Sequence, residues 1–240
     1  MQSTADEIIS VCVSGDIDRV SALLDADPTL VNAMNMFGST PMHAAHYSGH
    51  NDIVQLLFAR GRVLDGFLAA ELGLLDELRA ELDRDPEFAT RFSATGTSAL
   101  HGACYWGSVH AARLLLERGA DVDAFTTDSF LKIAPIGCAV ATPDVPNPSQ
   151  DESVVVSLVE LLLEFEADVN CPRRDGMTAL HGAAYRGHVK VIRKLLAAGA
   201  NPNARSHAGA GPHAGESPLD TAMAQGQDAA AEALRSAADW

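Results

Sequence analysis

The chain has 240 residues, of which 47% are hydrophobic and 20% charged, a composition typical of a folded globular protein. It carries 17 basic and 32 acidic residues, a formal net charge of −15, which argues against binding to nucleic acid or to an anionic membrane surface. Four scattered cysteines without a Cys-x-x-Cys pair predict buried thiols in a reducing compartment. We expect an acidic, cytoplasmic protein with no signal peptide and no membrane span.

Helix pairs are predicted from the start of the chain. Residues 6–33 are expected to form two helices separated by Gly15. Residues 64–91 repeat this plan around Gly73, at an offset of 58 residues. The first half of the chain is therefore predicted to contain a duplicated pair of structural units.

A four-residue signature recurs along the chain at intervals of 58, 36, 44 and 39 residues. Its copies are Thr40-Pro41-Met42-His43, Ser98-Ala99-Leu100-His101, Ala134-Pro135-Ile136-Gly137, Thr178-Ala179-Leu180-His181 and Ser217-Pro218-Leu219-Asp220. The better copies are followed by a helix-ending glycine, an apolar run and Gly-Ala-Asp/Asn-x-Asn/Asp. Thr or Ser at the first position caps a helix, and Pro at the second loses no hydrogen bond. The pattern resembles the ankyrin repeat, a unit of about 33 residues.

The resemblance implies an all-α ankyrin-repeat solenoid, in which stacked helix pairs are joined by short β-hairpin fingers. Each repeat would bury its apolar face only against its neighbours. We expect a single domain over residues 1–240 with about seven repeats. These repeats are 4–33 (N-terminal cap), 34–63, 64–92 (short), 93–125, 126–172 with an insertion at 141–153, 173–205 and 206–240 (C-terminal cap).

The aromatic residues predict where a partner binds. The three tyrosines each stand two residues before the helix-ending glycine of a repeat, a register that the resemblance places on the concave groove. Tyr, Trp and Arg are enriched at interface hot spots, although packing along the stack is an alternative role for these tyrosines. The predicted binding residues, in the groove and on the fingers, are Tyr47, Tyr105, Trp106, Tyr185, Arg186, Phe37, Phe125, Phe130 and Arg174.

The insertion at 141–153 contains three prolines and cannot continue a helix. We expect a loop between the two helices of the fifth repeat, which folds toward the groove as a lid or an acidic wall. This loop also suggests an alternative function: an enzyme or small-ligand-binding protein with a pocket lined by Tyr105, Trp106, Tyr185, Cys104 and the insertion. A purely structural role is a third hypothesis.

Signatures of chemistry are absent from the sequence: it contains no phosphate-binding glycine loop, nucleophile elbow or zinc-protease motif. His43, His101 and His181 occupy the same place in three repeats, which favours bonds to the backbone of adjacent fingers. A metal site at His46 and a Cys104–His101 nucleophile pair are the disfavoured alternatives. We expect no catalytic residues, no metal and no cofactor, and a monomer that binds another protein.

Overall fold

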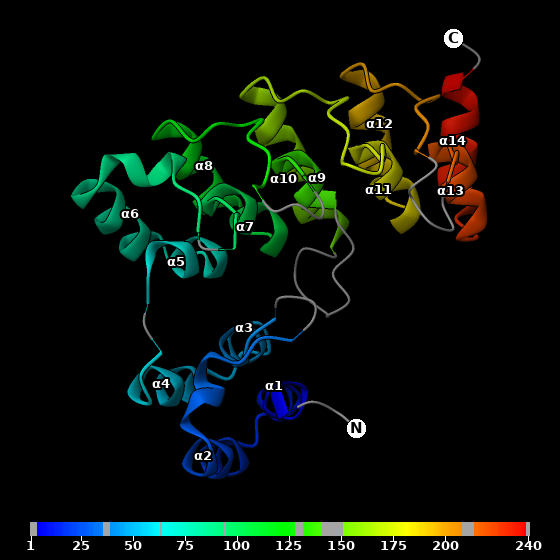
Figure 1. Ribbon diagram of the computed structural model, residues 1–240. Coiled ribbons are helices and arrows are strands. Elements are labelled where there is room, and N and C mark those ends of the chain that lie inside the picture. The colour runs from blue at the N-terminus through cyan, green and yellow to red at the C-terminus, as the bar shows by residue number, and fades with distance from the viewer. Residues whose placement is uncertain are drawn as a thin grey trace. The chain divides into compact units, whose positions relative to one another are not determined.

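The computed structural model describes residues 4–35, 39–62, 64–93, 95–127, 132–140, 151–207 and 214–238. These residues form two compact units (Figure 1): an N-terminal unit, which holds the described residues up to Asp65, and a C-terminal unit, which holds those from Gly66 onward. The expected single domain over 1–240 stays a prediction. Phe37, Phe130 and most of the predicted insertion lie outside the described residues.

Helices make up all the named elements of the described residues, which confirms the all-α prediction. The N-terminal unit contains α1 (Thr4–Ser14), α2 (Ile17–Ala26), the 3-10 helix η1 (Pro28–Asn32), α3 (Pro41–Tyr47) and α4 (Asn51–Ala59). The C-terminal unit contains α5 (Gly66–Leu72), α6 (Leu75–Arg84), the 3-10 helix η2 (Pro86–Thr90), α7 (Ala99–Trp106), α8 (Val109–Glu117), α9 (Pro135–Val140), α10 (Glu152–Glu164), α11 (Ala179–Arg186), α12 (Val189–Ala197), α13 (Pro218–Ala224) and α14 (Asp228–Ala238).

The helices of the C-terminal unit form two layers (Figure 1). The first helices of successive pairs, α5, α7, α9, α11 and α13, pack on one another in that order, and we call them the inner layer. The second helices, α6, α8, α10, α12 and α14, pack in the same order and form the outer layer. The N-terminal unit has the same plan, with α1 on α3 and α2 on α4. Each pair thus buries its apolar side against neighbouring pairs, as in a repeat protein.

The residues at the helix ends explain where each inner helix begins and stops. The Ser98 hydroxyl accepts a hydrogen bond from the His101 backbone N–H at 3.4 Å and caps α7. Gly107 ends the same helix with φ of 83°, a left-handed conformation that favours glycine. Pro135 and Pro218 stand first in α9 and α13, where a missing N–H costs nothing.

Leucine and isoleucine side chains fill the space between the layers. Leu100, Ile136 and Leu180 of the inner helices are fully buried, as are Leu158 and Leu195 of the outer helices. Burying such a side chain contributes about 1.5–3 kcal/mol. The core therefore runs continuously along the C-terminal unit.

The fingers between repeats are tight turns and not paired strands in the described residues. The Ser93 N–H donates to the Thr97 carbonyl at 2.8 Å, and the Arg173 N–H donates to the Met177 carbonyl at 2.8 Å. The first of these turns also carries an isolated bridge between Phe92 and Ser98. The predicted hairpins are thus present as turns, each closed by one or two hydrogen bonds between the two sides of the turn.

Two helices flank the segment where the insertion is predicted. Helix α9 ends at Val140, and α10 begins at Glu152. The Asp151 carboxylate accepts a hydrogen bond from the Ser153 N–H at 2.8 Å and caps α10. Because of this cap, Glu152 and Ser153 belong to the helix, and the expected loop boundary at 153 was two residues too late.

Candidate partner-binding surface

Two of the predicted groove residues lie on inner helices that flank the same helix, α9. Tyr105 lies in the last turn of α7 and Arg186 at the end of α11. Helix α9, which packs between these helices, stops at Val140, before it reaches the tyrosine register. Burial lowers the pKa of Arg186, and its electrostatic interaction with Tyr105 opposes that shift. Tyr105 and Arg186 thus interact electrostatically from the two helices that flank α9.

The aromatic residues of this surface differ in accessibility. The Tyr105 and Trp106 rings meet edge to face, with centroids 5.3 Å apart. Trp106 is only 5% exposed, whereas Tyr185 is 36% exposed. Leu72, which likewise precedes a helix-ending glycine, is also buried. Trp106 is therefore an interior residue whose ring packs against that of Tyr105, and the accessible aromatic surface comes from the tyrosines.

Tyr47 belongs to the N-terminal unit and is half-buried among histidines. Its ring stacks on His43 at 6.5 Å and meets His46 edge to face at 5.1 Å. Tyr47 therefore packs against two histidines of its own helix, which is the alternative role for these tyrosines.

The predicted binding residues of the fingers that the structure describes, Phe125 and Arg174, lie on different fingers. The Phe125 ring is half-buried, and the Lys132 Nζ lies 4.9 Å from its centroid, a cation–π contact. Arg174 is exposed on the following finger. Phe37 and Phe130 fall outside the described residues, so the structure places neither of them.

An anchor at the end of the insertion was missed by sequence reasoning. The Glu152 carboxylate accepts a hydrogen bond from the Lys190 N–H at 2.7 Å. Burial lowers the pKa of His188, the charge of Arg186 lowers it further, and the Glu152 and Asp151 carboxylates raise it. The start of α10 is thus fixed beside the start of α12. Two adjacent acids directly before an apolar helix were the available signal.

The recurring histidines are structural, as predicted. His101 Nδ1 accepts from the Ser98 N–H at 3.2 Å, so its Nε2 carries the proton and lies 3.0 Å from the Ile133 carbonyl. His181 Nε2 contacts the Glu216 carbonyl in the same way at 3.1 Å. Each ring therefore ties an inner helix to the next finger.

The same geometry argues against a Cys104–His101 nucleophile pair. Both ring nitrogens of His101 are engaged with Ser98 and Ile133. Cys104 is 0% exposed, and burial raises the pKa of its thiol well above the ordinary range, which disfavours the thiolate.

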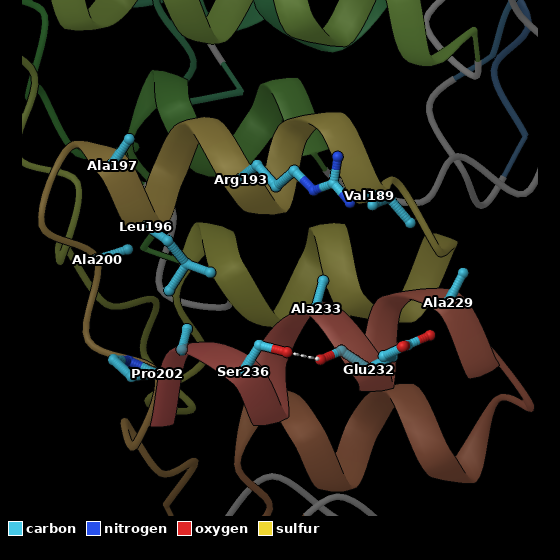
Figure 2. Close-up of a pocket in the computed structure, with 11 residues that line it drawn as sticks. Val189, Arg193, Leu196, Ala197, Ala200, Pro202, Ala229, Glu232, Ala233 and Ser236 are labelled. Atoms are coloured by element: carbon cyan, nitrogen blue, oxygen red, sulfur yellow. Dashed lines mark hydrogen bonds between the residues drawn. The ribbon is translucent and has the colours of Figure 1, made fainter. Parts of the chain in front are cut away.

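A surface cavity of about 700 Å³ lies in the outer layer, between α12 and α14 (Figure 2). Its lining residues are Val189, Arg193, Leu196, Ala197, Ala200, Pro202, Ala229, Glu232, Ala233, Ser236 and Ala237. None of them belongs to the pocket proposed from the sequence around Tyr105 and the insertion. In the sequence, the alanines at every fourth position of α14 indicated a helix face with small side chains, which leaves room for this cavity.

Within the described part of the chain, no three His, Cys, Asp or Glu side chains gather in a way that could hold a metal ion. None of the described helices combines the length and the apolar character needed to cross a membrane.

A family model for ankyrin repeats (3 copies) matches residues 8–126 and 152–240. The chain therefore belongs to the ankyrin-repeat family, which confirms the resemblance seen in the sequence. Its similarity to B-cell lymphoma 3 protein of Homo sapiens is 33% identity over 202 residues, 79% of this chain and 42% of the human protein. The corresponding mouse homolog (Mus musculus) is 31% identical over 195 residues, 76% of this chain and 41% of that protein.

The nuclear factor NF-kappa-B p105 subunit of Gallus gallus is 29% identical over 202 residues, 78% of this chain and 19% of that protein. The chain thus spans about two fifths or less of the length of these relatives. Family membership identifies the chain as a protein–protein interaction domain.

Proposed function

We propose that this protein is a non-catalytic recognition module whose protein partner docks on the inner layer of the C-terminal unit. The observation that carries the proposal is the neighbouring pair Tyr105 and Arg186, with the 36% exposed Tyr185 preceding Arg186 in the same turn. Aromatic rings and a partly desolvated guanidinium are the groups that contribute most to protein interfaces. The net charge of −15 favours a basic or neutral partner.

The lid or acidic wall expected from the insertion stays a prediction, because residues 141–150 lie outside the described residues. What supports a place for it near the site is the Glu152–Lys190 hydrogen bond, which holds the described end of the insertion at the start of α12, directly after α11. Phe125 and Arg174 extend the site onto the fingers. We propose the cytoplasm as its location, because the four cysteines carry thiols.

The test is a binding measurement with a partner recovered by affinity capture and then purified. We expect Tyr185→Ala and Arg186→Ala each to weaken the Kd by roughly 10-fold or more. Arg193→Ala and Glu232→Ala on the outer layer are the controls and should leave the Kd unchanged. The proposal is wrong if the outer variants weaken binding while the inner variants do not.

A second measurement addresses the insertion. Deletion of residues 143–150 keeps the Asp151 cap and the Glu152 anchor. We expect the deletion to change the Kd while the melting temperature stays close to that of the wild type, because α9 and α10 keep their contacts with the neighbouring helices. A loss of stability with unchanged binding would contradict a role in the site.

A further inference from the structure

Two buried cysteines lie on adjacent helices of the inner layer. Cys104 is in α7 and is 0% exposed, and Cys138 is in α9 and is 7% exposed. Helices α7 and α9 pack directly on each other. Both residues carry thiols, and neither has a part in the proposed recognition surface.

The repeat register places these two residues against each other. Cys104 is the sixth residue of α7, and Cys138 is the fourth residue of α9. At the next interface, the corresponding residues are Val140, the sixth of α9, and Gly182, the fourth of α11. A Cβ atom added to Gly182 would lie 3.2 Å from the Val140 Cβ and 2.8 Å from its Cγ2. The sixth place of one inner helix therefore touches the fourth place of the next.

Two further observations agree with this register. A Cβ atom added to Gly102, the fourth residue of α7, would meet the Glu71 side chain of the preceding inner helix, α5. Cys104 and Cys138 also interact electrostatically: after burial, the neighbouring Cys138 thiol is the next cause that raises the pKa of Cys104. The Cβ atoms of a disulfide are about 3.5–4.5 Å apart, a separation that this contact provides with a small adjustment.

We propose that Cys104 and Cys138 form an oxidisable dithiol, which a hydroperoxide converts into a disulfide across the α7–α9 interface. Cys138, the more exposed of the two, reduces the O–O bond of the peroxide and becomes a sulfenic acid, releasing water or an alcohol. The Cys104 sulfur then attacks the Cys138 sulfur. The S–S bond forms, the S–O bond breaks, and the hydroxyl leaves as water with the Cys104 proton.

The new bond would connect two repeats directly beside the recognition surface, because Cys104 immediately precedes Tyr105. Disulfides in a reducing compartment are transient and redox-sensing. Burial slows the reaction by disfavouring the thiolate, so the pair responds to sustained oxidant and not to brief exposure.

The experiment counts thiols in the folded wild-type protein after treatment with hydrogen peroxide. Thiols are alkylated in denaturant and counted by mass spectrometry, and a digest locates any linked peptides. We expect the count to fall from four to two, with one linked peptide pair containing Cys104 and Cys138, and to return to four with dithiothreitol. Cys104→Ala and Cys138→Ala should each abolish the link.

Cys12 provides a matched control. It is 0% exposed and stands three residues before Gly15, as Cys104 stands three before Gly107. The register places Ala44, the fourth residue of α3, against it. Cys12 should therefore stay reduced in the wild type, and Ala44→Cys should create a second linked pair that includes Cys12.

Retention of all four thiols by the folded wild type, or a link that involves Cys171, would overturn the proposal. The wild-type peptide map decides this without any variant. Circular dichroism before and after treatment verifies that the helical fold persists during oxidation.

Discussion

At the scale of single residues, His181 joins its own helix to the next finger through both ring nitrogens. Its Nδ1 accepts from the Thr178 N–H at 3.1 Å, and its Nε2 contacts the Glu216 carbonyl at 3.1 Å. Protonation of Nδ1 would break the first of these bonds, because that nitrogen would become a donor. Burial also lowers the pKa of His181 below its ordinary value of 6.5.

The first prediction is a pH dependence of stability. Because the folded-state pKa of His181 is lowered, the unfolded chain binds the proton first as the pH falls below 6.5. The contribution of His181 to the free energy of unfolding should therefore be complete above this pH and decline below it. Urea titrations at about pH 7.5 and about pH 5.5 would measure the difference. His181→Ala should flatten this decline and cost roughly 1–3 kcal/mol at the higher pH. Replacing the exposed His110 should leave the decline intact, and an equal flattening there would contradict the assignment.

The second prediction concerns Gly187. It ends α11 with φ of 71°, and a Cβ atom there would lie 2.2 Å from the Gln227 Oε1. Gly199 also has a positive φ, of 90°, but open space around it. Gly187→Ala should lower the free energy of unfolding by about 1 kcal/mol more than Gly199→Ala, because only the former displaces Gln227, whose side-chain Nε2 donates to the Tyr185 carbonyl at 3.5 Å. Equal losses of unfolding free energy in the two variants, measured in urea, would show that backbone strain alone sets the cost of the substitution.

At the scale of elements, the fourth place of each inner helix sets how closely that helix approaches the preceding one. Gly182 lies against Val140, including its backbone carbonyl, 2.9 Å from an added Cβ atom. Gly102 lies against the flexible Glu71 side chain. The same residue type in the same place therefore meets a rigid neighbour at one interface and a movable neighbour at the other.

This contrast gives the third prediction. Gly182→Ala should destabilise the protein by roughly 1–2 kcal/mol, because α9 and α11 must separate. Gly102→Ala should be neutral or stabilise by up to about 1 kcal/mol, because Glu71 can move and alanine favours the helix. Thermal and urea unfolding of both variants measures the difference. Equal effects of the two substitutions would contradict the close approach of α9 and α11.

The sequence predicted the helix pairs and their caps because each repeat carries its own local signals. Ser98, Pro135 and Gly107 act within one turn of chain, so their roles follow from spacing alone. The burial of Trp106 and the Glu152 anchor depend on neighbouring repeats and could not be derived from one repeat. The cavity between α12 and α14 depends likewise on how two outer helices pack, which composition does not determine.

At the scale of the whole molecule, the described residues divide into two compact units, each with its own layers of helices. In repeat proteins the free energy of unfolding is approximately the sum of the stability of each repeat and of each interface between adjacent repeats. A fragment that retains several adjacent repeats should therefore keep its fold. The C-terminal unit retains five consecutive inner helices with their outer partners, α5 to α14.

The fourth prediction is that a fragment of residues 66–240 folds by itself. It should show a helical circular dichroism spectrum and one cooperative urea transition. A shorter fragment of residues 132–240 begins at α9, without α7 and α8, and should be less stable because α9 and α10 lose their neighbours. A fragment 66–240 that stays unfolded would contradict the division into units.

The early stop of α9 has a consequence for protein engineering. Helix α9 ends at Val140 and α10 begins after the Asp151 cap, while α9 still packs on α7 and α10 still packs on α8 and α12. The length of the connection between α9 and α10 can therefore change without a loss of the packing between neighbouring helices. Foreign peptides could therefore be grafted between these two residues, so that one natural departure from periodicity would accept new binding sequences.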